Sequence, residues 1–371
     1  MPIDHVSISN FKSIRELSKL KLRPLNVLIG ANGTGKSNFL DFFDLLQHIS
    51  NDELGKFLAK KGYSNRLLHF GQKVSPSMSG SIVFKKQADH YPRNRYDFEL
   101  KPDASKGMYF ELEEAGYNFH IDYGDVKWDM QEITGYPPDR SGLLDELDVP
   151  ERVSYLRSLF QDFKSFHFHD TSSSSALKQP ARLRDNRYLR EDGSNLPAFL
   201  YLLKEKHKSS YRLIEYAIRS IAPFFDRFEL SPDELNDEMI YLSWKEKDSS
   251  EYFDAHNLSD GSLRFIALAT VLLQPNPPAT IIIDEPELGL HPAAINKLVG
   301  ILQSVKAKSQ IIISTQSINL LDQFEPEDII VVDREEDQSV FKRLSRERLS
   351  QWLEAYSVGQ LWGKNIIGGM P

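Results

Sequence analysis

One stretch decides the fold of this 371-residue chain: Gly30-Ala31-Asn32-Gly33-Thr34-Gly35-Lys36-Ser37. It matches the phosphate-binding pattern G-x-x-x-x-G-K-[ST] in full. Glycines let backbone N–H groups converge on phosphate oxygens, and we expect Lys36 to neutralise the β- and γ-phosphates and Ser37 to ligate Mg²⁺. An apolar strand is expected over 20–29, and apolar residues at helical spacing follow the loop. A chance match in a glycine-rich turn is the alternative, but this strand–loop–helix context favours a nucleotide site.

The second half of such a site is expected about 250 residues later, where a β-branched run ends in Asp284 and Glu285. Asp284 is expected to hold the magnesium shell, and Glu285 to polarise the attacking water as general base. A buried strand that ends in two solvated acids is the alternative. The complete phosphate loop in the same chain favours the nucleotide interpretation.

A third motif, His256-Asn257-Leu258-Ser259-Asp260-Gly261-Ser262-Leu263-Arg264, precedes a helix expected over 259–273. Ser259 is a good N-cap, and Gly261 permits a close approach of the backbone. The motif is therefore either a plain helix cap or a second anion site at a helix N-terminus. Since it has no lysine of its own, such a site completes a nucleotide pocket only across a dimer interface.

The order of elements predicts an α/β fold with a parallel sheet flanked by helices, an antiparallel β subdomain and an inserted, mainly helical lobe. Strands expected over 280–283, 310–314 and 328–332 alternate with helices near the C-terminus, and the phosphate loop lies near the N-terminus. The two ends are expected to form one head. The predicted parts are 1–72 (head, first part), 73–136 (β-rich), 137–235 (lobe) and 236–371 (head, second part).

With these motifs the chain resembles the ABC-type ATPase heads of the RecF and SMC class. Residues 8–14 look like the opening of that class, 258–261 like its signature, with Asp260 where transporters carry glycine, and 288–292 like its D-loop region. Segments 168–172, 192–196 and 359–362 resemble a group of short predicted AAA-type ATPases. This group has an OLD-like head without a Toprim nuclease domain.

The resemblance implies a homodimer that encloses two ATP molecules with Mg²⁺. The implied ATP-binding residues are Gly30, Ala31, Asn32, Gly33, Thr34, Gly35, Lys36, Ser37 and Asn38, with Lys12 and Arg15 as basic residues beside the nucleotide. Ser259, Asp260 and Gly261 would reach the nucleotide of the other copy. The implied catalytic residues are Lys36, Glu285 and Gln316, and the implied magnesium ligands are Ser37, Asp284 and Gln72, the last as the glutamine of the loop before the β-rich part.

Gln316 departs from the class, which commonly has a histidine at this position in contact with the γ-phosphate. A glutamine donates a hydrogen bond but cannot carry a positive charge. Slow turnover is the consequence we expect.

The composition of the chain argues against several classes of site and of partner. The chain has no cysteine, which excludes disulfides, thiolate metal sites and cysteine nucleophiles. No secretory signal or membrane span is readable, so we expect a cytoplasmic protein, with nucleoid association left open. The net charge of −8 argues against a surface coated with nucleic acid.

Three groups of side chains leave alternatives open. Lys178, Arg182, Arg184, Arg187 and Arg190 either contact DNA or, as we favour, face solvent or pair with nearby acids. His167, His169 and Asp170 are a turn or core cluster in preference to a metal site. Aromatic residues of the β-rich part favour a sheet core over a base-stacking platform: Tyr91, Tyr96, Phe98, Tyr109 and Phe110.

The leading functional hypothesis is an ATP hydrolase that homodimerises on ATP and acts on DNA or a DNA-associated complex in repair, maintenance or phage defence. The alternative is an ATP-gated dimer switch with slow turnover, which controls a separately encoded effector nuclease or toxin without DNA contact of its own. A nucleotide-binding regulator of metabolism is the third.

Overall fold

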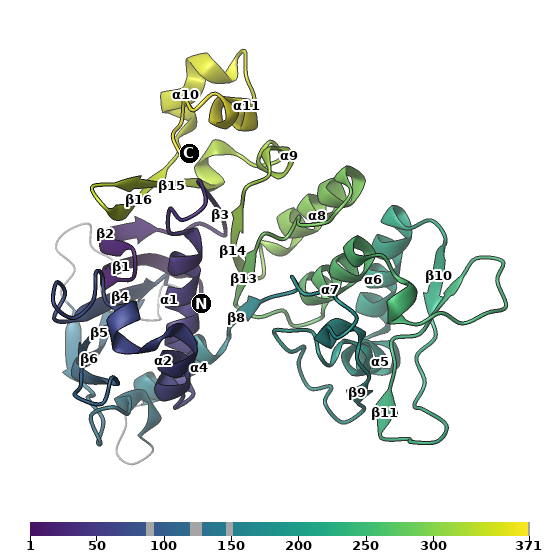
Figure 1. Ribbon diagram of the computed structural model, residues 1–371, viewed down its shortest axis with the longest axis horizontal. Helices are drawn as coiled ribbons and strands as arrows, with labels where there is room; N and C mark the ends of the chain where they lie inside the picture. The colour runs from purple at the N-terminus through teal and green to yellow at the C-terminus, as the bar shows by residue number, and fades with distance from the viewer. Residues whose placement is uncertain (87–92, 119–127, 146–150, 370–371) are drawn as a thin grey trace.

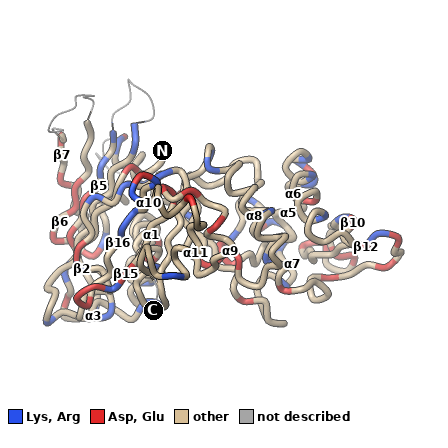
Figure 2. The backbone as a smooth tube through the Cα atoms, turned by 90° about the horizontal axis from the view of Figure 1, so that it is seen from above, with Lys and Arg blue, Asp and Glu red and all other residues tan. Residues whose placement is uncertain are grey.

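The computed structural model describes residues 1–86, 93–118, 128–145 and 151–369 of the chain. It shows a head with two sheets and, beside it, a lobe built mainly of helices (Figure 1). The long helix α1 (Lys36–Ser50) lies between the two sheets of the head. Positions of Lys and Arg are interspersed with positions of Asp and Glu along head and lobe (Figure 2).

The first sheet of the head is mostly parallel and has the strand order β16-β15-β3-β14-β13-β8. Its strands are β3 (Leu25–Ile29), β8 (Phe163–Phe166), β13 (Thr280–Asp284), β14 (Gln310–Thr315), β15 (Ile329–Glu335) and, antiparallel at the edge, β16 (Gln338–Arg343). Helices cover both faces, which explains the uninterrupted β-branched runs. Ile282 and Ile312 belong to the core around α1, whereas Ile281 and Ile313 belong to the core shared with the lobe.

The second sheet is antiparallel, with the order β2-β1-β4-β5-β6-β7. Its strands are β1 (Ile3–Phe11), β2 (Ile14–Lys21), β4 (Met78–Phe84), β5 (Arg93–Pro102), β6 (Met108–Asn118) and β7 (Asp129–Glu132). Phe42 of α1 stacks on Phe98 with ring centroids 6.1 Å apart. Tyr96, Phe98 and Phe110 are buried and Tyr109 is partly buried, so these aromatics form a sheet core. Tyr91 lies outside the described residues.

The head also contains two elements that the sequence assigned to the lobe. Helix α4 (Glu151–Gln161) packs on α1, next to α2 (Leu54–Lys61) and α3 (Tyr63–Leu67). Strand β8 pairs in parallel with β13. The helical lobe expected over 137–235 therefore differs from the structure, because the chain leaves the head only after β8 (Figure 1).

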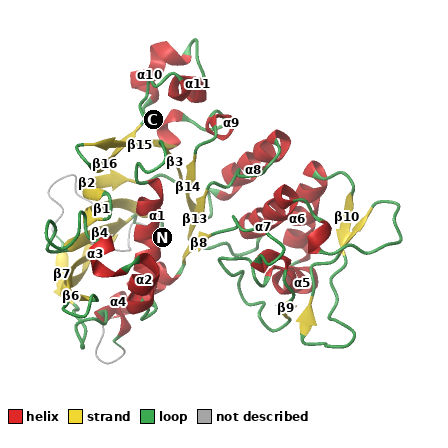
Figure 3. Cartoon of the chain, in the orientation of Figure 1, coloured by secondary structure: helices red, strands yellow, loops and turns green. Residues whose placement is uncertain are grey.

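The lobe contains α5 (Leu196–Lys206), α6 (Lys208–Ile221) and α7 (Asp260–Leu273), with α8 (Pro292–Val305) packed against α6 and α7 (Figure 3). Its short strands are β9 (Ala181–Arg182), β10 (Phe225–Phe228), β11 (Met239–Ile240) and β12 (Trp244–Glu246). The C-terminal part adds α9 (Ile318–Leu321), α10 (Arg346–Leu353) and α11 (Val358–Gly363). Single 3-10 turns are η1 (Gly142–Leu144), η2 (Ala176–Lys178), η3 (Ala255–Asn257) and η4 (Pro326–Asp328). Among the described residues, no helix has the length and apolar character needed to cross a membrane.

Candidate nucleotide-binding site

A cavity of about 150 Å³ lies where the phosphate loop meets the carboxyl ends of β13 and β14. Three segments far apart in the sequence line it, and all of its lining residues are ones that the sequence singled out. They are Asn32, Gly33, Gly35, Lys36, Ser37, Asn38, Asp284, Glu285 and Gln316. The carboxyl end of a parallel sheet is the usual location of such a site.

The loop itself requires glycine at close approaches. A Cβ on Gly30 would lie 2.2 Å from the backbone oxygen of Val332. Gly35 has φ +111°, and a Cβ there would lie 2.0 Å from Ser339 Oγ. Helix α1 starts directly after Gly35 without a side-chain cap. Its first N–H groups are thus not taken by a capping side chain and can bind phosphate oxygens.

Lys36 is buried in the loop. Its Nζ donates to the carbonyl oxygens of Gly30 at 2.6 Å and Ala31 at 2.9 Å. Burial lowers the pKa of the ammonium, against the opposing effect of Asp284 and Glu285. The negative charges of Asp284 and Glu285 act on this ammonium group. A bound triphosphate would add further negative charge beside it.

Asp284 has the partners expected of a magnesium-shell residue. Ser37 Oγ lies 3.3 Å from Asp284 Oδ2, and Ser314 Oγ donates to the other carboxylate oxygen. Hydroxyl and carboxylate oxygens are ligands that Mg²⁺ accepts. Ser37 and Asp284 therefore fit the ion, with Ser314 orienting the carboxylate.

Gln72, by contrast, is not among the residues that line this cavity. Its side-chain amide donates to Ser64 Oγ at 2.8 Å, and its backbone N–H donates to Asn65 Oδ1 at 3.2 Å. The arrangement gives no support to the prediction that Gln72 ligates magnesium, because its side chain is engaged within its own loop.

Gln316, just after β14, bridges the two halves of the cavity. Its Nε2 donates to Glu285 Oε1 at 2.5 Å and to Asn32 Oδ1 at 2.8 Å. Glu285 has a positive φ of 42°, a conformation that is uncommon for a residue other than glycine. The glutamine thus fixes the carboxylate of the predicted general base next to the phosphate loop.

Sequence reasoning missed two polar neighbours of this bridge. Thr315 Oγ1 donates to Glu287 Oε1 at 2.5 Å, and burial, with a further effect of Glu285, raises the pKa of the Glu287 carboxyl. The signal was present in the polar pair Ser314-Thr315 at the end of an isoleucine run, where a buried strand turns polar.

A larger cavity of about 490 Å³ adjoins the first through Asn38, which lines both. Asn38 Nδ2 donates to Ser13 Oγ at 2.7 Å. Lys12 lines this second cavity and pairs with Asp41. Arg15 is exposed on β2 and lines neither cavity. Lys12 therefore lies at the cavity that adjoins the phosphate loop, whereas Arg15 lies at neither cavity.

The motif of Ser259, Asp260 and Gly261 is an N-terminal turn of α7. Ser259 Oγ accepts the backbone N–H of Ser262 at 3.1 Å. Ser259 and Asp260 are exposed to solvent. A Cβ on Gly261 would lie 2.4 Å from the oxygen of Gly289, so this glycine packs directly on the segment that follows Glu285.

The five basic residues of the lobe, for which DNA contact stays a prediction, have different surroundings in the structure. Lys178 is partly buried: its Nζ donates to the oxygen of Thr171 at 2.6 Å and lies 3.5 Å from Asp260 Oδ1. Arg190 pairs with Asp185 at 2.6 Å and Arg184 with Glu238 at 3.7 Å. Arg182 and Arg187 are exposed. Pairing with nearby acids, the interpretation we favoured, describes Arg190 and Arg184.

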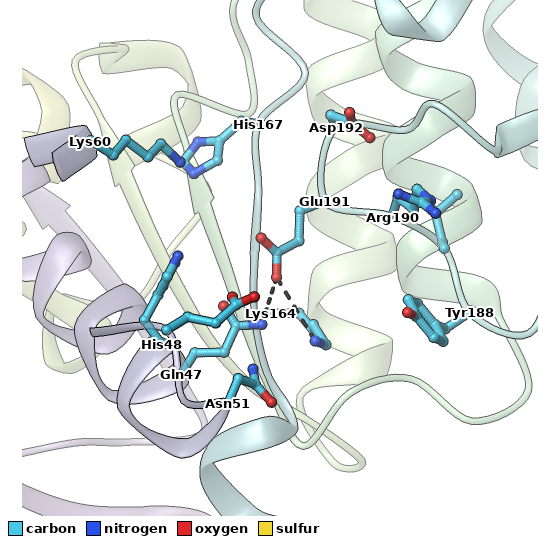
Figure 4. Close-up of a pocket in the computed structure, with 12 residues that line it drawn as sticks. Gln47, His48, Asn51, Lys60, Lys164, His167, Tyr188, Arg190, Glu191 and Asp192 are labelled. Atoms are coloured by element: carbon cyan, nitrogen blue, oxygen red, sulfur yellow. Dashed lines mark hydrogen bonds and ion pairs between the residues drawn. The ribbon is translucent and has the colours of Figure 1, made fainter. Parts of the chain in front are cut away.

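Arg190 also lines a cavity of about 470 Å³ between α1 and residues 188–192 (Figure 4). Glu191 projects into it and accepts from Gln47 Nε2 at 2.7 Å, with Lys164 Nζ at 3.9 Å. These contacts connect the head to the first segment of the lobe.

His167 and His169 have different partners. His167 Nε2 lies 3.2 Å from Ser165 Oγ, and His169 Nε2 donates to the backbone oxygen of Asp284 at 2.8 Å. Strand β8 ends at Phe166, so the two histidines are not alternate residues of one strand. Within the described part of the chain, no three His, Cys, Asp or Glu side chains gather in a way that could hold a metal ion.

Comparison with known proteins identifies the family and the fold of the chain. Residues 25–322 match the family described as "AAA domain, putative AbiEii toxin, Type IV TA system". No curated protein matches the sequence. Among solved structures, the chain is similar to an Smc head bound to the C-winged helix domain of ScpA, with 16% identity and a TM-score of 0.60 over 94% of this chain and 99% of that one.

A second similar structure is the Smc head domain with an extended coiled coil, bound to the C-terminal domain of ScpA, from Pyrococcus furiosus. It shows 14% identity and a TM-score of 0.60 over 95% of this chain and 98% of that one. At such identities the likeness concerns the fold, and it confirms the predicted RecF/SMC-like ABC-type head. The chain belongs to the AAA-domain family that its residues 25–322 match, and its fold is that of an SMC-type ATPase head.

Proposed function

We propose that this protein binds ATP with Mg²⁺ and hydrolyses it in a homodimer that encloses two nucleotides. The observation that carries the proposal is the single cavity in which the phosphate loop, Asp284, Glu285 and Gln316 meet. Each group that phosphoryl transfer to water requires has a residue there: donors for the phosphates, oxygens for magnesium and a carboxylate for the water.

Each residue has a role that follows from its position. Lys36 and the uncapped start of α1 bind the phosphates. Ser37 and Asp284 hold Mg²⁺, which when bound neutralises charge on the β- and γ-phosphates. Glu285 accepts a proton from the attacking water, and Gln316 keeps its carboxylate oriented through the 2.5 Å bond.

The homodimer is proposed because the turn of Ser259–Gly261 begins helix α7 and has no lysine of its own, so as an anion site it would need the phosphate loop of another copy. Ser259 and Asp260 are exposed, and the turn is not among the residues that line the subunit's own phosphate cavity. A second copy can therefore bring this turn to the γ-phosphate from the opposite side.

The test compares three variants by light scattering after size exclusion and by ATP turnover. Glu285→Gln is expected to bind ATP and Mg²⁺, to stop turnover and to accumulate as a dimer. Lys36→Ala should neither bind nor dimerise, whereas the control Glu234→Gln, an exposed glutamate of the lobe, should behave like the wild type. A Glu285→Gln variant that stays monomeric at saturating ATP and Mg²⁺ contradicts the shared site.

Two downstream roles follow from different observations. Action on DNA or a DNA-associated complex, in the cytoplasm or at the nucleoid, agrees with the SMC-type fold. An ATP-gated switch for a separately encoded effector agrees with the neutral Gln316 and with the toxin–antitoxin description of the family. Turnover that rises when duplex DNA is added favours the first role, and slow turnover indifferent to DNA, with stable ATP dimers, favours the second.

A further inference from the structure

Arg264, in the first turns of α7, holds the backbone of two other segments. Its Nε donates to the oxygen of Phe168 at 3.0 Å, and its Nη2 to the oxygen of His169 at 2.5 Å. Its Nη1 donates to the oxygen of Leu288 at 2.6 Å. A guanidinium can hold three carbonyls at once because its donors form a rigid planar fork.

Near Arg264, Gly261 and Gly289 allow two backbone segments to pack directly against each other. Gly289 has φ +76°, and a Cβ on it would lie 2.7 Å from Arg264 Nη1. The oxygen of Gly289 in turn lies against Gly261. The exposed turn 259–261 is thus in direct contact with residues 288–289. Arg264, which follows the turn, donates to the oxygen of Leu288 in that same segment.

Two further hydrogen bonds connect the segment 168–171 to Lys178 and to Asp284. Lys178 Nζ donates to the oxygen of Thr171 and lies 3.5 Å from Oδ1 of Asp260, which belongs to the exposed turn. His169 Nε2 donates to the oxygen of Asp284, the predicted magnesium residue. The start of α7 is therefore held against the segment 168–171, which is itself bonded to the end of β13.

We propose that Arg264 is a positioning residue for ATP hydrolysis, which fixes the turn 259–261 in the orientation that the second copy's nucleotide requires. The proposal rests on the shared site of the proposed function. Arg264 is not among the residues lining its own subunit's phosphate cavity, so its loss should spare nucleotide binding there. The defect should instead fall on the nucleotide that the partner copy holds.

The test separates these two locations by mixing subunits. Arg264→Ala alone should bind a fluorescent ATP analogue within about twofold of the wild type and lose turnover by about tenfold or more, since about 1.4 kcal/mol corresponds to tenfold. Arg264→Lys, without the planar fork, should recover only part of the turnover. The control Arg212→Ala, an exposed arginine of α6, should keep wild-type turnover.

Turnover should return when Arg264→Ala is mixed with the inactive Glu285→Gln. In the mixed dimer the Arg264→Ala subunit has its own Glu285 and receives an intact turn from its partner. A mixture as inactive as Arg264→Ala alone, or an Arg264→Ala variant as active as the wild type, overturns the proposal.

Two controls keep the result interpretable. If Arg264→Ala does not fold, Gly289→Ala tests the same contact, because its Cβ would displace Arg264 Nη1 and its φ disfavours alanine. If Glu285→Gln does not dimerise by itself, the shared site fails and the role of Arg264 fails with it. Failure of the mixing experiment with dimeric Glu285→Gln refutes the role of Arg264 alone.

Discussion

Glu113 on β6 offers a prediction about stability whose magnitude follows from its surroundings. Its side chain is fully buried, and its carboxylate accepts hydrogen bonds from Tyr96 O–H at 2.6 Å, from the backbone N–H of Gly142 at 2.7 Å and from Ser141 O–H. Burial raises the pKa of this carboxyl to about 7, although the three hydrogen bonds act in the opposite direction.

The sign of the pH dependence follows from where the proton is bound more tightly. The reference pKa of the carboxyl is 4.5, so between pH 4.5 and 7 the folded protein retains a proton that the unfolded chain releases. The stability that this proton confers is complete below pH 4.5 and is lost as the pH rises through 7. At about 1.4 kcal/mol per pKa unit, the loss amounts to about 3.5 kcal/mol.

Glu113→Gln retains an acceptor oxygen but cannot ionise, so it should remove this dependence. We expect the variant to be about as stable as the wild type at pH 5 and up to about 3.5 kcal/mol more stable at pH 8. Urea unfolding of the nucleotide-free protein at several pH values measures the difference. Glu114→Gln, the next residue on the opposite face of the strand, is the control. A wild-type-minus-variant difference that stays constant from pH 5 to 8 refutes the reasoning.

Two further predictions concern the nucleotide cavity. Gln316→Leu should lower kcat about tenfold and leave the nucleotide dissociation constant within about twofold, since it removes a charge-assisted bond to Glu285 of about 1.5 kcal/mol. Equal changes in kcat and affinity would contradict this role. Ser314→Ala should raise the Mg²⁺ concentration for half-maximal turnover about tenfold, because an outer partner of Asp284 is lost. An unchanged magnesium titration would show that Ser314 does not orient the carboxylate.

The sequence was sufficient to name every residue that lines the phosphate cavity, because those residues belong to local patterns. Gly35 and Lys36 lie in a fixed motif, and Asp284 and Glu285 follow a β-branched run that had to be a buried strand. Gln316 was predicted in the same way, because it directly follows the strand expected from the next β-branched run. In each case the chemistry is attached to the end of a strand or the start of a helix, both of which a sequence pattern can locate.

Positions decided by distant partners could not be predicted in the same way. Strand β8 has only four residues, and its membership of the parallel sheet depends on pairing with β13, more than 100 residues away. Lys178 belongs to a basic run that suggested a surface, yet its side chain is only 9% exposed and lies beside Asp260. Gln72 is a different case: it precedes the β-rich part as expected of the glutamine loop, but its amide is bonded to Ser64, only eight residues away. No periodicity distinguishes these alternatives.

The two halves of the proposed site differ in how they are held, and this explains what the sequence could reveal. The phosphate loop requires glycine at Gly30 and Gly35, because a Cβ there would clash with neighbouring atoms. This requirement restricts the residue type, and a sequence motif therefore reveals it. The turn 259–261 is held mainly by a cation on backbone carbonyls, and a carbonyl is the same in every residue. Substitutions at Phe168 or Leu288 can leave the bonds of Arg264 intact, whereas Gly289 and Arg264 itself cannot change without loss of a contact. The hydrogen bonds of Arg264 therefore leave no pattern at the carbonyl positions of the sequence, and only the structure reveals them.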